Sequence, residues 1–255
     1  MPLRHGLGRI RPGRSRDAGH GPVWLLDLDN TLHDASHRLM AEINRRMTDY
    51  IMSRLGLSRE QASERRQRYW RRYGATLLGL VAHDGIDATD FLHQTHPDHD
   101  LLDHLLPVRG QSLRIQRLRG RHWLLTNAPR QYAWRVLRFL GLDRQFERII
   151  CVEDMRAIGR LRPKPSAWLW RRLVRLTGRP AGQVILVDDS TDNLRGAHRA
   201  GLRTARVWAS AAQRAKGWSL GRPPSAQRPV FAHHQVNCLS ALARLGDSVR
   251  RRAHD

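Results

Sequence analysis

Residues 24–34 read WLLDLDNTLHD, an apolar run that ends on two aspartates placed two positions apart. The apolar half is short and does not alternate with polar residues, which is typical of a strand buried on both faces. In open α/β sheets, ligands bind beyond the carboxyl ends of the strands. The stretch therefore predicts a central strand, followed by a turn that carries Asp27 and Asp29 to a functional edge.

Apolar runs of this kind recur along the chain, at residues 23–28, 122–126, 149–152, 184–187 and 204–208. Helical patterns lie between the later runs, at residues 129–141, 165–178 and 194–201, and each is closed by a glycine. Pro129 suits the first helical position of its segment. Strands that alternate with helices predict an α/β fold with a Rossmann-like, doubly wound parallel sheet.

A long insertion separates the first strand from the second, because about 90 residues lie between them. Apolar residues recur every four positions from Leu39 to Leu55. Ser58 with Gln61 predicts a capping box that opens another helix, which runs through Tyr73. We therefore expect a helical lobe at residues 34–108, inserted into an α/β core formed by residues 22–33 and 109–209.

The two ends of the chain lack the patterns of the core. Residues 1–21 are basic and glycine-rich without an apolar h-region, so we expect a disordered leader, or a start codon placed too far upstream, and no secretory signal. Residues 210–255 form a tail whose apolar stretch at residues 236–245 is expected to dock as a strand or a helix. No apolar run approaches the roughly 20 residues that span a bilayer, so no membrane partner is expected.

The formal net charge of +22 favours contacts with polyanions, because clustered basic side chains neutralise phosphates. Every basic residue except Lys164 and Lys216 is an arginine, also within stretches that read as amphipathic helix. This pattern indicates a codon bias toward arginine more than a dedicated basic patch. We expect non-specific attraction to polyanions and no specific nucleic-acid binding.

The two cysteines, Cys151 and Cys238, cannot form a disulfide framework and have no metal-binding spacing. Cys151 lies within an apolar run and is expected to be a small core side chain. These features predict a reduced, cytoplasmic protein, and nothing in the sequence indicates its oligomeric state.

Four histidines lie close together in the insertion, namely His93, His96, His99 and His104. Their spacing fits no standard zinc ligand set on a helix, and Pro97 interrupts the segment. We interpret them as surface residues of a lobe hinge, without a metal.

Polar residues follow the predicted strands at the edge where ligands bind. They are Asp27, Asp29 and Thr31 after the first strand, Thr126 and Asn127 after the second, and Asp188 with Asp189 after the fourth. Each group alone has a structural interpretation, such as a turn or a helix cap. Lys164 precedes a predicted helix, and a lysine in a chain of arginines suits a site that needs a compact ammonium. Together these residues predict one chemical site.

As a set, these residues resemble the four motifs of the haloacid dehalogenase superfamily of phosphohydrolases. The motifs match Asp27, Asp29 and Thr31, then Thr126, then Lys164, and finally Asp188 with Asp189. The resemblance covers residues 22–208, and the insertion after the first motif resembles the helical C1 cap of that family. It implies a Rossmann-like core with an inserted cap, and a Mg²⁺-dependent hydrolase of phosphoric monoesters.

The resemblance also implies a role for each motif residue. Asp27 would be the nucleophile that forms an aspartyl-phosphate. Asp29 would protonate the leaving oxygen and then deprotonate the attacking water. Thr126, the backbone N–H of Asn127 and Lys164 would bind the phosphoryl oxygens.

Magnesium is the cofactor that the resemblance implies, and it prefers oxygen ligands. It would be held by Asp27, the backbone carbonyl of Asp29, and Asp189. Asp188 would act through a water molecule, although which of Asp188 and Asp189 is the direct ligand stays open.

The second aspartate favours phosphoryl transfer over dehalogenation, because dehalogenases of this superfamily lack it as an acid and base. A phosphomutase shares all four motifs, so hydrolase and mutase both stay open. A phosphatase of another small ester, such as phosphoglycolate or a sugar phosphate, is an alternative. A basic nucleic-acid-binding protein on a degenerate fold of this family is another.

The loop after the first motif and RYWRRYGATLLGL at residues 68–80 resemble the pyrimidine 5′-nucleotidase subgroup of the superfamily. This resemblance implies UMP- or CMP-like nucleoside monophosphates as substrates. Candidates to reach the base or the ribose are His33, Arg72, Tyr73 and Thr76. Packing inside the lobe is the alternative for Tyr69, Trp70 and Tyr73, and for Tyr69 and Trp70 it is at least as well supported.

Overall fold

The computed structural model describes residues 21–35, 39–96, 105, 110–208, 229–236 and 239–242. The predicted leader, except Gly21, and most of the predicted tail lie outside these ranges, as do Lys216, Cys238, His99 and His104. Within the described residues, no helix has the length and apolar character needed to cross a membrane.

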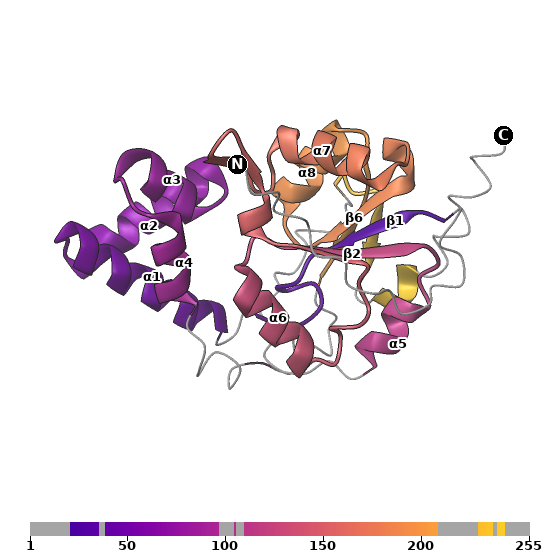
Figure 1. Ribbon diagram of the computed structural model, residues 1–255, viewed down its shortest axis with the longest axis horizontal. Coiled ribbons are helices and arrows are strands. Elements are labelled where there is room, and N and C mark those ends of the chain that lie inside the picture. The colour runs from indigo at the N-terminus through magenta and orange to yellow at the C-terminus, as the bar shows by residue number, and fades with distance from the viewer. Residues whose placement is uncertain are drawn as a thin grey trace, which may run out of the picture.

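A parallel sheet forms the centre of the molecule (Figure 1). Within the described ranges it has six strands in the spatial order β3-β2-β1-β6-β7-β8, and all neighbours are parallel. The winding direction reverses between β1 and β6, as in doubly wound folds, which confirms the predicted fold class. The strands are β1 (Val23–Leu26), β2 (Arg121–Leu125), β3 (Arg148–Ile150), β6 (Val184–Asp188), β7 (Arg203–Val207) and β8 (His234–Val236).

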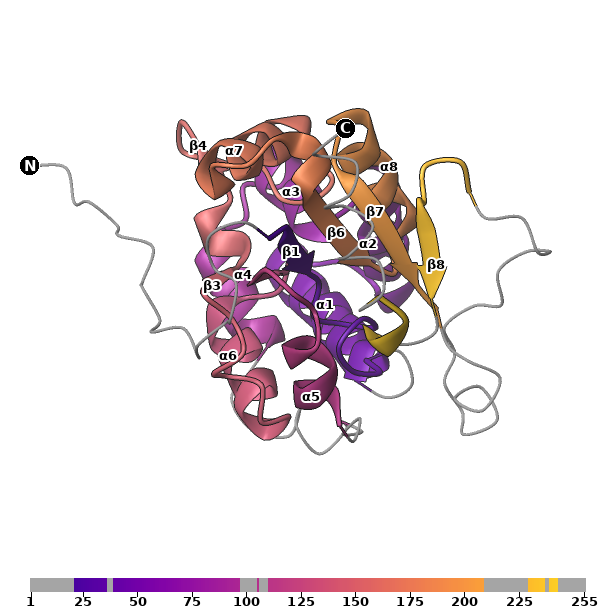
Figure 2. The same cartoon turned by 90° about the vertical axis from the view of Figure 1, so that its right-hand side faces the viewer.

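Helices cover both faces of this sheet (Figure 2). One layer contains α5 (Gln111–Gln116) and α6 (Arg130–Phe139), and the other contains α7 (Ala167–Thr177) and α8 (Thr191–Arg199). In β1, Trp24 and Leu26 face the α6 side, whereas Val23 and Leu25 face the α7 and α8 side, and all four are fully buried. Burial on both faces explains why the apolar run does not alternate with polar residues.

A lobe of four helices lies beside the sheet within residues 39–96 (Figure 1). It comprises α1 (Leu39–Leu55), α2 (Arg59–Tyr73), α3 (Thr76–His83) and α4 (Ala88–Thr95). The lobe has a hydrophobic cluster of its own, which includes Ile51, Tyr69, Leu80 and Phe91. The predicted capping box is present, because Ser58 caps α2 and exchanges hydrogen bonds with Gln61.

Several boundaries differ from the predicted ones by a few residues. Helix α6 begins at Arg130, so Pro129 caps it and does not occupy its first turn. Helix α8 begins at Thr191, ahead of the predicted start at residue 194, because the hydroxyl of Ser190 accepts a hydrogen bond from Asn193 N. Both differences concern residues just outside the apolar pattern.

Two short features remain, a tail segment that was expected to dock as a strand or a helix and a hairpin that was not predicted. The apolar stretch at residues 236–245 begins with the end of β8 and continues in a 3₁₀ turn, η4 (Leu239–Leu242), that packs near α5. Between β3 and α7 lies a hairpin of β4 (Arg156–Ala157) and β5 (Arg160–Leu161). Its turn residues Ile158 and Gly159 both have positive φ, 49° and 73°, which is the geometry of a tight hairpin.

Candidate active site

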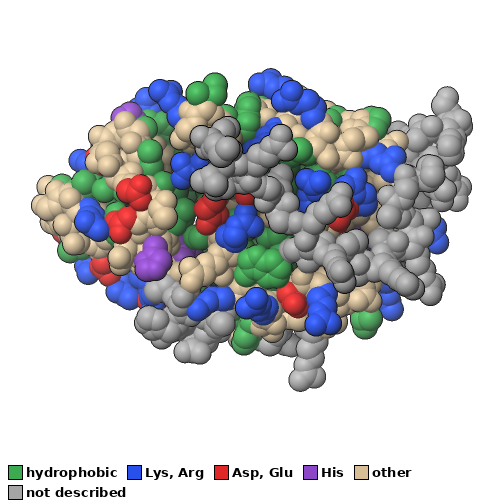
Figure 3. Space-filling model, in the orientation of Figure 1, with side chains coloured by type: hydrophobic (Ala, Val, Ile, Leu, Met, Phe, Trp, Pro, Cys, Tyr) green, Lys and Arg blue, Asp and Glu red, His purple; other side chains and the backbone are tan. Residues whose placement is uncertain are grey.

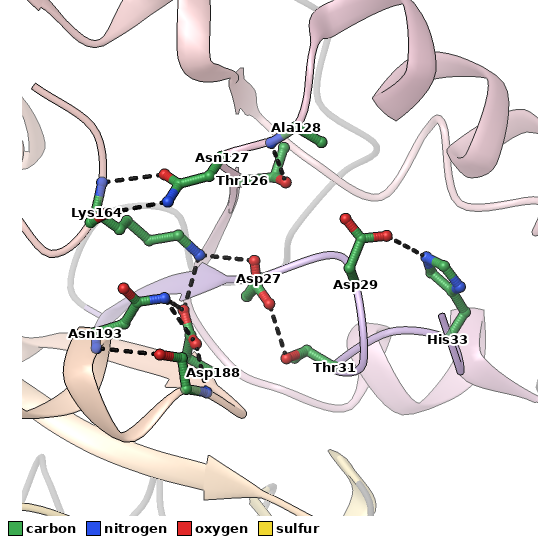
Figure 4. Close-up of polar contacts among 11 residues, drawn as sticks. Asp27, Asp29, Thr31, His33, Thr126, Asn127, Ala128, Lys164, Asp188 and Asn193 are labelled. Carbon is green, nitrogen blue, oxygen red and sulfur yellow. Dashed lines mark hydrogen bonds and ion pairs between the residues drawn. The ribbon is translucent and has the colours of Figure 1, made fainter. Parts of the chain in front are cut away.

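The loop after β1 is fixed by its own hydrogen bonds. Asp27 N donates to Val187 O at 3.0 Å, so the chain stays paired with β6 one residue past the end of β1. Asn30 has a φ of 60°, a left-handed conformation that asparagine tolerates, and its Oδ1 accepts from Ala35 N at 3.0 Å. The loop therefore holds Asp27 and Asp29 in separate, defined directions (Figure 4).

Lys164 joins Asp27 to Asp188 where the winding of the sheet reverses. Its Nζ donates to Asp27 Oδ1 at 2.7 Å and to Asp188 Oδ2 at 2.8 Å (Figure 4). All three side chains are buried, and Lys164 is only 2% exposed. Three motif residues that lie far apart in the sequence thus meet at the carboxyl edge of the central strands, as predicted.

Burial and charge shift the pKa values of this triad in a consistent way. Burial and the nearby charge of Asp188 raise the pKa of Asp27 to about 7, although Lys164 opposes that shift. Burial alone would lower the pKa of Lys164, but the carboxylates of Asp188 and Asp27 outweigh it and raise the value above its ordinary range. The lysine therefore stays a cation.

The backbone of Lys164 is held from two sides. Asn127 Nδ2 donates to Lys164 O and Asn127 Oδ1 accepts from Lys164 N, both at 3.0 Å. On the other side, a Cβ on Gly196 would lie 2.9 Å from Pro165 O, so α8 approaches this loop as closely as a glycine allows. The side chain of Asn127 therefore positions the lysine, which its sequence position did not reveal.

The two acidic residues after β6 have different environments. Asp188 is fully buried, and its oxygens accept from Lys164 Nζ, Ser190 N and Asn193 Nδ2. Asp189 is half-buried beside a cavity, and the part of the chain that the structure describes offers it no ion-pair partner. Burial and the charges of Asp188 and Asp27 raise the pKa of Asp189 well above its ordinary range.

A hard cation fits this donor set. One carboxylate oxygen each from Asp27, Asp188 and Asp189 lies within 4.8 Å of the others. Three carboxylates this close repel one another, and Lys164 compensates only part of their charge. Oxygen donors in such a cluster are the ligands that Mg²⁺ prefers.

The carboxylate of Asp29 lies apart from this acidic cluster. Its Oδ1 accepts a hydrogen bond from Tyr132 Oη at 2.6 Å and contacts His33 Nε2 at 3.0 Å. Burial would raise the pKa of Asp29, but the contacts with His33 and Tyr132 outweigh burial and hold it below its ordinary range. The ring of His96 meets Tyr132 edge-on at 5.5 Å, and burial lowers the pKa of His96 to about 4.

A cavity of about 590 Å³ lies between the lobe and the core. The core contributes Asp27, Asp29, Thr126, Lys164 and Asp189 to its lining. The lobe contributes, among others, Asn44, Arg66, Gln67, Trp70, Thr76 and His96. These five motif residues therefore share one cavity with side chains of α1, α2, α3 and α4, whereas Asp188 and Thr31 do not line it.

The predicted substrate residues fall in different places. Thr76 lines the cavity, and its hydroxyl donates to Arg66 O at 3.0 Å. His33 is buried against Asp29 and does not line the cavity. Arg72 is exposed above the ring of Tyr73, whose hydroxyl contacts His83, and neither Arg72 nor Tyr73 lines the cavity.

Aromatic residues of the lobe divide between its interior and the cavity. Tyr69 is buried in the lobe cluster, as predicted. Trp70 was predicted in the lobe interior as well, but this interpretation is wrong, since its side chain is 62% exposed and lines the cavity. Helical geometry explains the difference, because neighbouring residues of a helix point about 100° apart.

Four residues near the site were missed as functional candidates, namely Tyr132, His96, Arg66 and Asn193. Tyr132 follows the second motif closely, in the first turn of α6, and this proximity is the signal that could have found it. His96 was grouped with surface histidines; His93 is exposed as expected, whereas His96 lines the cavity. Nothing in the local sequence distinguishes the two.

Comparison with known proteins gives a consistent result. The profile of the family described as haloacid dehalogenase-like hydrolase matches residues 23–201. Phosphoglycolate phosphatase of Pseudomonas fluorescens is 24% identical over 220 residues, which cover 81% of this chain and 74% of that protein. Phosphate metabolism protein 8 of Saccharomyces cerevisiae is 24% identical over 135 residues, 50% of this chain. The match spans 42% of the length of the yeast protein.

The fold has solved counterparts. The crystal structure of a HAD phosphatase from Thermococcus onnurineus superposes with a TM-score of 0.54 at 20% sequence identity. The superposition covers 89% of this chain and 97% of that one. At this level of identity the likeness concerns the fold alone.

Proposed function

The chain belongs to the haloacid dehalogenase-like hydrolase family, and within it we propose a Mg²⁺-dependent hydrolase of phosphate monoesters that acts through an aspartyl-phosphate. One observation carries this proposal: Lys164 links Asp27 to Asp188 at the floor of a cavity into which Asp29 also faces. A nucleophile, a cation for phosphoryl oxygens and a separate acid are thus present together.

The proposed reaction has two displacements at phosphorus. A carboxylate oxygen of Asp27 bonds to phosphorus while the ester P–O bond breaks, and the leaving oxygen takes a proton from Asp29 to depart as an alcohol. Water then bonds to phosphorus and gives a proton to Asp29, while the bond to Asp27 breaks and phosphate is released. Uncatalysed hydrolysis of such esters is so slow that enzymes accelerate it up to about 10²¹-fold. Division of the reaction into two displacements replaces one difficult step by two easier ones.

The other polar groups of the floor bind the phosphoryl group in this proposal. Thr126 Oγ1 accepts from Ala128 N at 3.0 Å, which leaves its own proton for a phosphoryl oxygen. Lys164 and the backbone N–H of Asn127 supply further donors. Mg²⁺ would be held by Asp27, Asp189 and the Asp29 backbone carbonyl, and when bound it neutralises charge on the phosphoryl oxygens. Because Asp188 is already saturated by protein donors, we assign it to a supporting role.

We further propose that the lobe acts as a cap and that pyrimidine nucleoside monophosphates, such as UMP and CMP, are the substrates. The resemblance at residues 68–80 supports this proposal, and so does the cavity wall formed by α2. Trp70 offers an exposed aromatic face for stacking on a base. Arg66 lines the cavity, and its donation to Asn44 Oδ1 at 2.7 Å and to Thr48 Oγ1 at 3.2 Å holds the guanidinium in place. In this proposal its remaining N–H groups donate to carbonyl oxygens of the base.

Cavity size also favours a substrate of this class over the smallest esters. A volume of about 590 Å³ lies within the range of sites that enclose ligands of drug-like size. Phosphoglycolate has few heavy atoms and would fill a smaller share of such a cavity. Phosphoglycolate and sugar phosphates are therefore the alternatives that the test must include.

Phosphate release from a panel of esters tests the proposal directly. The panel comprises UMP, CMP, AMP, phosphoglycolate and glucose 6-phosphate, each with Mg²⁺ and with a chelator. We expect Mg²⁺-dependent release that is fastest for UMP or CMP and absent in Asp27→Asn. Activity that persists in Asp27→Asn would refute the mechanism, whereas a preference for phosphoglycolate or the sugar phosphate would refute only the substrate class. Recovery of an isomeric phosphate ester instead of free phosphate would identify a mutase.

A further inference from the structure

The carboxyl group of Asp29 has two oxygens with unlike surroundings. Tyr132 Oη and His33 Nε2 both contact Oδ1, at 2.6 and 3.0 Å. Oδ2 has no hydrogen-bond partner among the described residues, and the side chain keeps 24% exposure on the cavity side. In Figure 4 one oxygen faces His33 and the other points away from it. The two oxygens are therefore not interchangeable in the folded protein.

We propose that Tyr132 and His33 are positioning residues that hold Asp29 with Oδ2 toward the substrate, so that this oxygen alone exchanges the proton. The proposal rests on the proposed function, because it concerns the acid and base of that reaction. Because His33 and Tyr132 favour the ionised carboxylate, Oδ2 first takes up a proton from solvent on the cavity side. In the first displacement, this proton passes to the leaving oxygen as the ester bond breaks. In the second, Oδ2 takes a proton from the attacking water, which restores the starting state.

Both positioning side chains are themselves immobilised by burial. Tyr132 is 3% exposed and belongs to the hydrophobic cluster on the α6 side of the sheet. His33 is 1% exposed, and a backbone bridge joins its residue to Asp29. Its other ring nitrogen, Nδ1, has no partner among the described residues, which favours the tautomer that carries the proton on Nε2 and donates it to Asp29. Two rigid donors from different elements thus fix one carboxyl group.

The lobe completes this arrangement from the other side. His96, the residue that follows α4, meets the ring of Tyr132 edge-on at 5.5 Å. Its Nδ1 contacts Thr95 Oγ1 at 2.9 Å, so its orientation is fixed within the lobe. Tyr132 and His33 thus form a clamp on Asp29, and His96 of the lobe covers this clamp at Tyr132.

The nucleophile is held by a different set of contacts. Lys164 and Thr31 bind the two oxygens of Asp27, and neither of them contacts Tyr132 or His33. Loss of the clamp should therefore weaken protonation of the leaving group and spare the attack by Asp27. An ester whose leaving group departs as a stable anion should tolerate the loss far better than an alkyl ester.

Leaving-group dependence provides the test. We compare kcat/KM of Tyr132→Phe on UMP and on p-nitrophenyl phosphate, since kcat/KM reports on the first displacement. The leaving oxygen of UMP needs a proton from Asp29 in that step, whereas p-nitrophenolate departs as a stable anion without one. We expect a fall of at least about tenfold on UMP, part of the roughly 10²- to 10⁴-fold that general acid catalysis contributes, and a fall of less than about threefold on the aryl ester. If another alkyl phosphate is turned over faster than UMP, that ester takes the place of UMP in the comparison with the aryl ester.

Matched variants separate this effect from a general loss of structure. Tyr50→Phe also removes a hydroxyl that donates to an aspartate at 2.6 Å, but this pair, Tyr50 with Asp90, lies in the lobe and Tyr50 does not line the cavity. It should leave both esters unchanged. His33→Leu should repeat the selective loss, and His33→Gln, which keeps an N–H donor of similar reach, should restore most of it.

Equal losses on both esters in Tyr132→Phe, or no loss on either, would overturn the positioning role while the hydrolase activity stands. A wild-type protein that hydrolyses neither ester would instead overturn the proposed function and this inference with it. The two failures are thus distinguished by the wild-type rate.

Discussion

Lys164 is almost fully buried, and its compact ammonium lies between two carboxylates. A guanidinium is planar and wider, so it could not bring one nitrogen to both oxygens in the same space. The single positive charge also offsets part of the repulsion between Asp27 and Asp188. At this position the chain departs from its general use of arginine for a geometric reason.

Replacement of this lysine should therefore cost both stability and activity. We expect Lys164→Met to lower the free energy of unfolding by about 3–5 kcal/mol in the presence of a chelator, because two buried carboxylates lose their partner. Urea denaturation measures this change, and phosphate release should be abolished. Lys164→Arg is the matched control of charge. Wild-type stability and turnover in Lys164→Arg would contradict the geometric explanation.

Residues of the site differ in how far sequence alone could identify them. Asp27, Thr126 and Asp188 end or follow strands, so the edge of a parallel sheet brings them together once the strands are recognised. Tyr132, Arg66 and His96 approach from helices, and their directions depend on how those helices pack. His33 illustrates the same limit, since only the closed loop after β1 shows that it turns back onto Asp29.

Secondary structure was predictable where its signals are local. The capping box of α2 involves residues three positions apart, and the structure has it as expected. Strand β8 has three residues and is defined by pairing with β7, which lies far away in the chain, so no local pattern announces it. The strands β4 and β5 are shorter still, with two residues each, and of the two turn residues only Gly159, not Ile158, gives a turn signal.

Helices α2 and α3 touch at a glycine. A Cβ on Gly79 would lie 2.1 Å from Tyr69 Cγ, so the ring of Tyr69 packs directly on the backbone of α3. We expect Gly79→Ala to lower the free energy of unfolding by about 1–3 kcal/mol through overpacking, despite the better helix propensity of alanine. Denaturant unfolding measures the change. Gly182→Ala is the control, because a Cβ there meets nothing within 4 Å; equal effects of both substitutions would contradict the close approach.

A pair of charged side chains ties β2 to the residues before β3. Arg121 donates to both oxygens of Glu147 at 2.7 and 2.8 Å, and also to Thr177 O at 2.9 Å. The hydrogen bonds from Arg121 hold the pKa of Glu147 below its ordinary value of 4.5. The unfolded chain therefore takes up this proton at a higher pH than the folded protein does.

The stabilisation by this pair should depend on pH accordingly. It is fully present above the unfolded pKa near 4.5 and is lost as the pH falls through the lower folded value. We expect Glu147→Gln to be less stable than the wild type by about 1 kcal/mol or less at pH 7, since the pair is partly exposed. The difference should shrink below about pH 4, as measured by urea denaturation across pH. The exposed residue Glu64, changed to Gln, is the control; a difference that grows toward low pH would contradict the assignment.

Basic and acidic side chains are mixed on the surface that Figure 3 shows. Lys and Arg side chains are scattered over the face seen in Figure 3, with acidic side chains among them. Several arginines among the described residues pair with acids, as in Arg54 with Asp90, Arg59 with Asp49 and Arg195 with Asp192. On the face that Figure 3 shows, the described residues do not form the continuous basic surface that is typical of a dedicated nucleic-acid-binding protein.

Binding to nucleic acid should consequently be weak and non-specific. We expect affinity for a DNA duplex to fall steeply between about 50 and 200 mM salt, without preference for sequence, because release of counterions supplies the binding energy. Fluorescence anisotropy measures this affinity. Heparin should compete for binding as effectively as DNA of unrelated sequence does. Tight, sequence-selective binding that survives 200 mM salt would favour the alternative of a nucleic-acid-binding protein instead.

Helix α1 belongs to both halves of the molecule. Leu39 and Ile43 lie in the core cluster, Tyr50 and Ile51 lie in the lobe cluster, and Met47 packs against both. Since a helix is stiff, α1 joins the lobe to the core as one rigid element. A graft of this lobe onto another scaffold should therefore begin after Met47. The earlier residues of α1, which include Leu39 and Ile43, belong to the hydrophobic core of this protein and would lose their packing partners in a transplant.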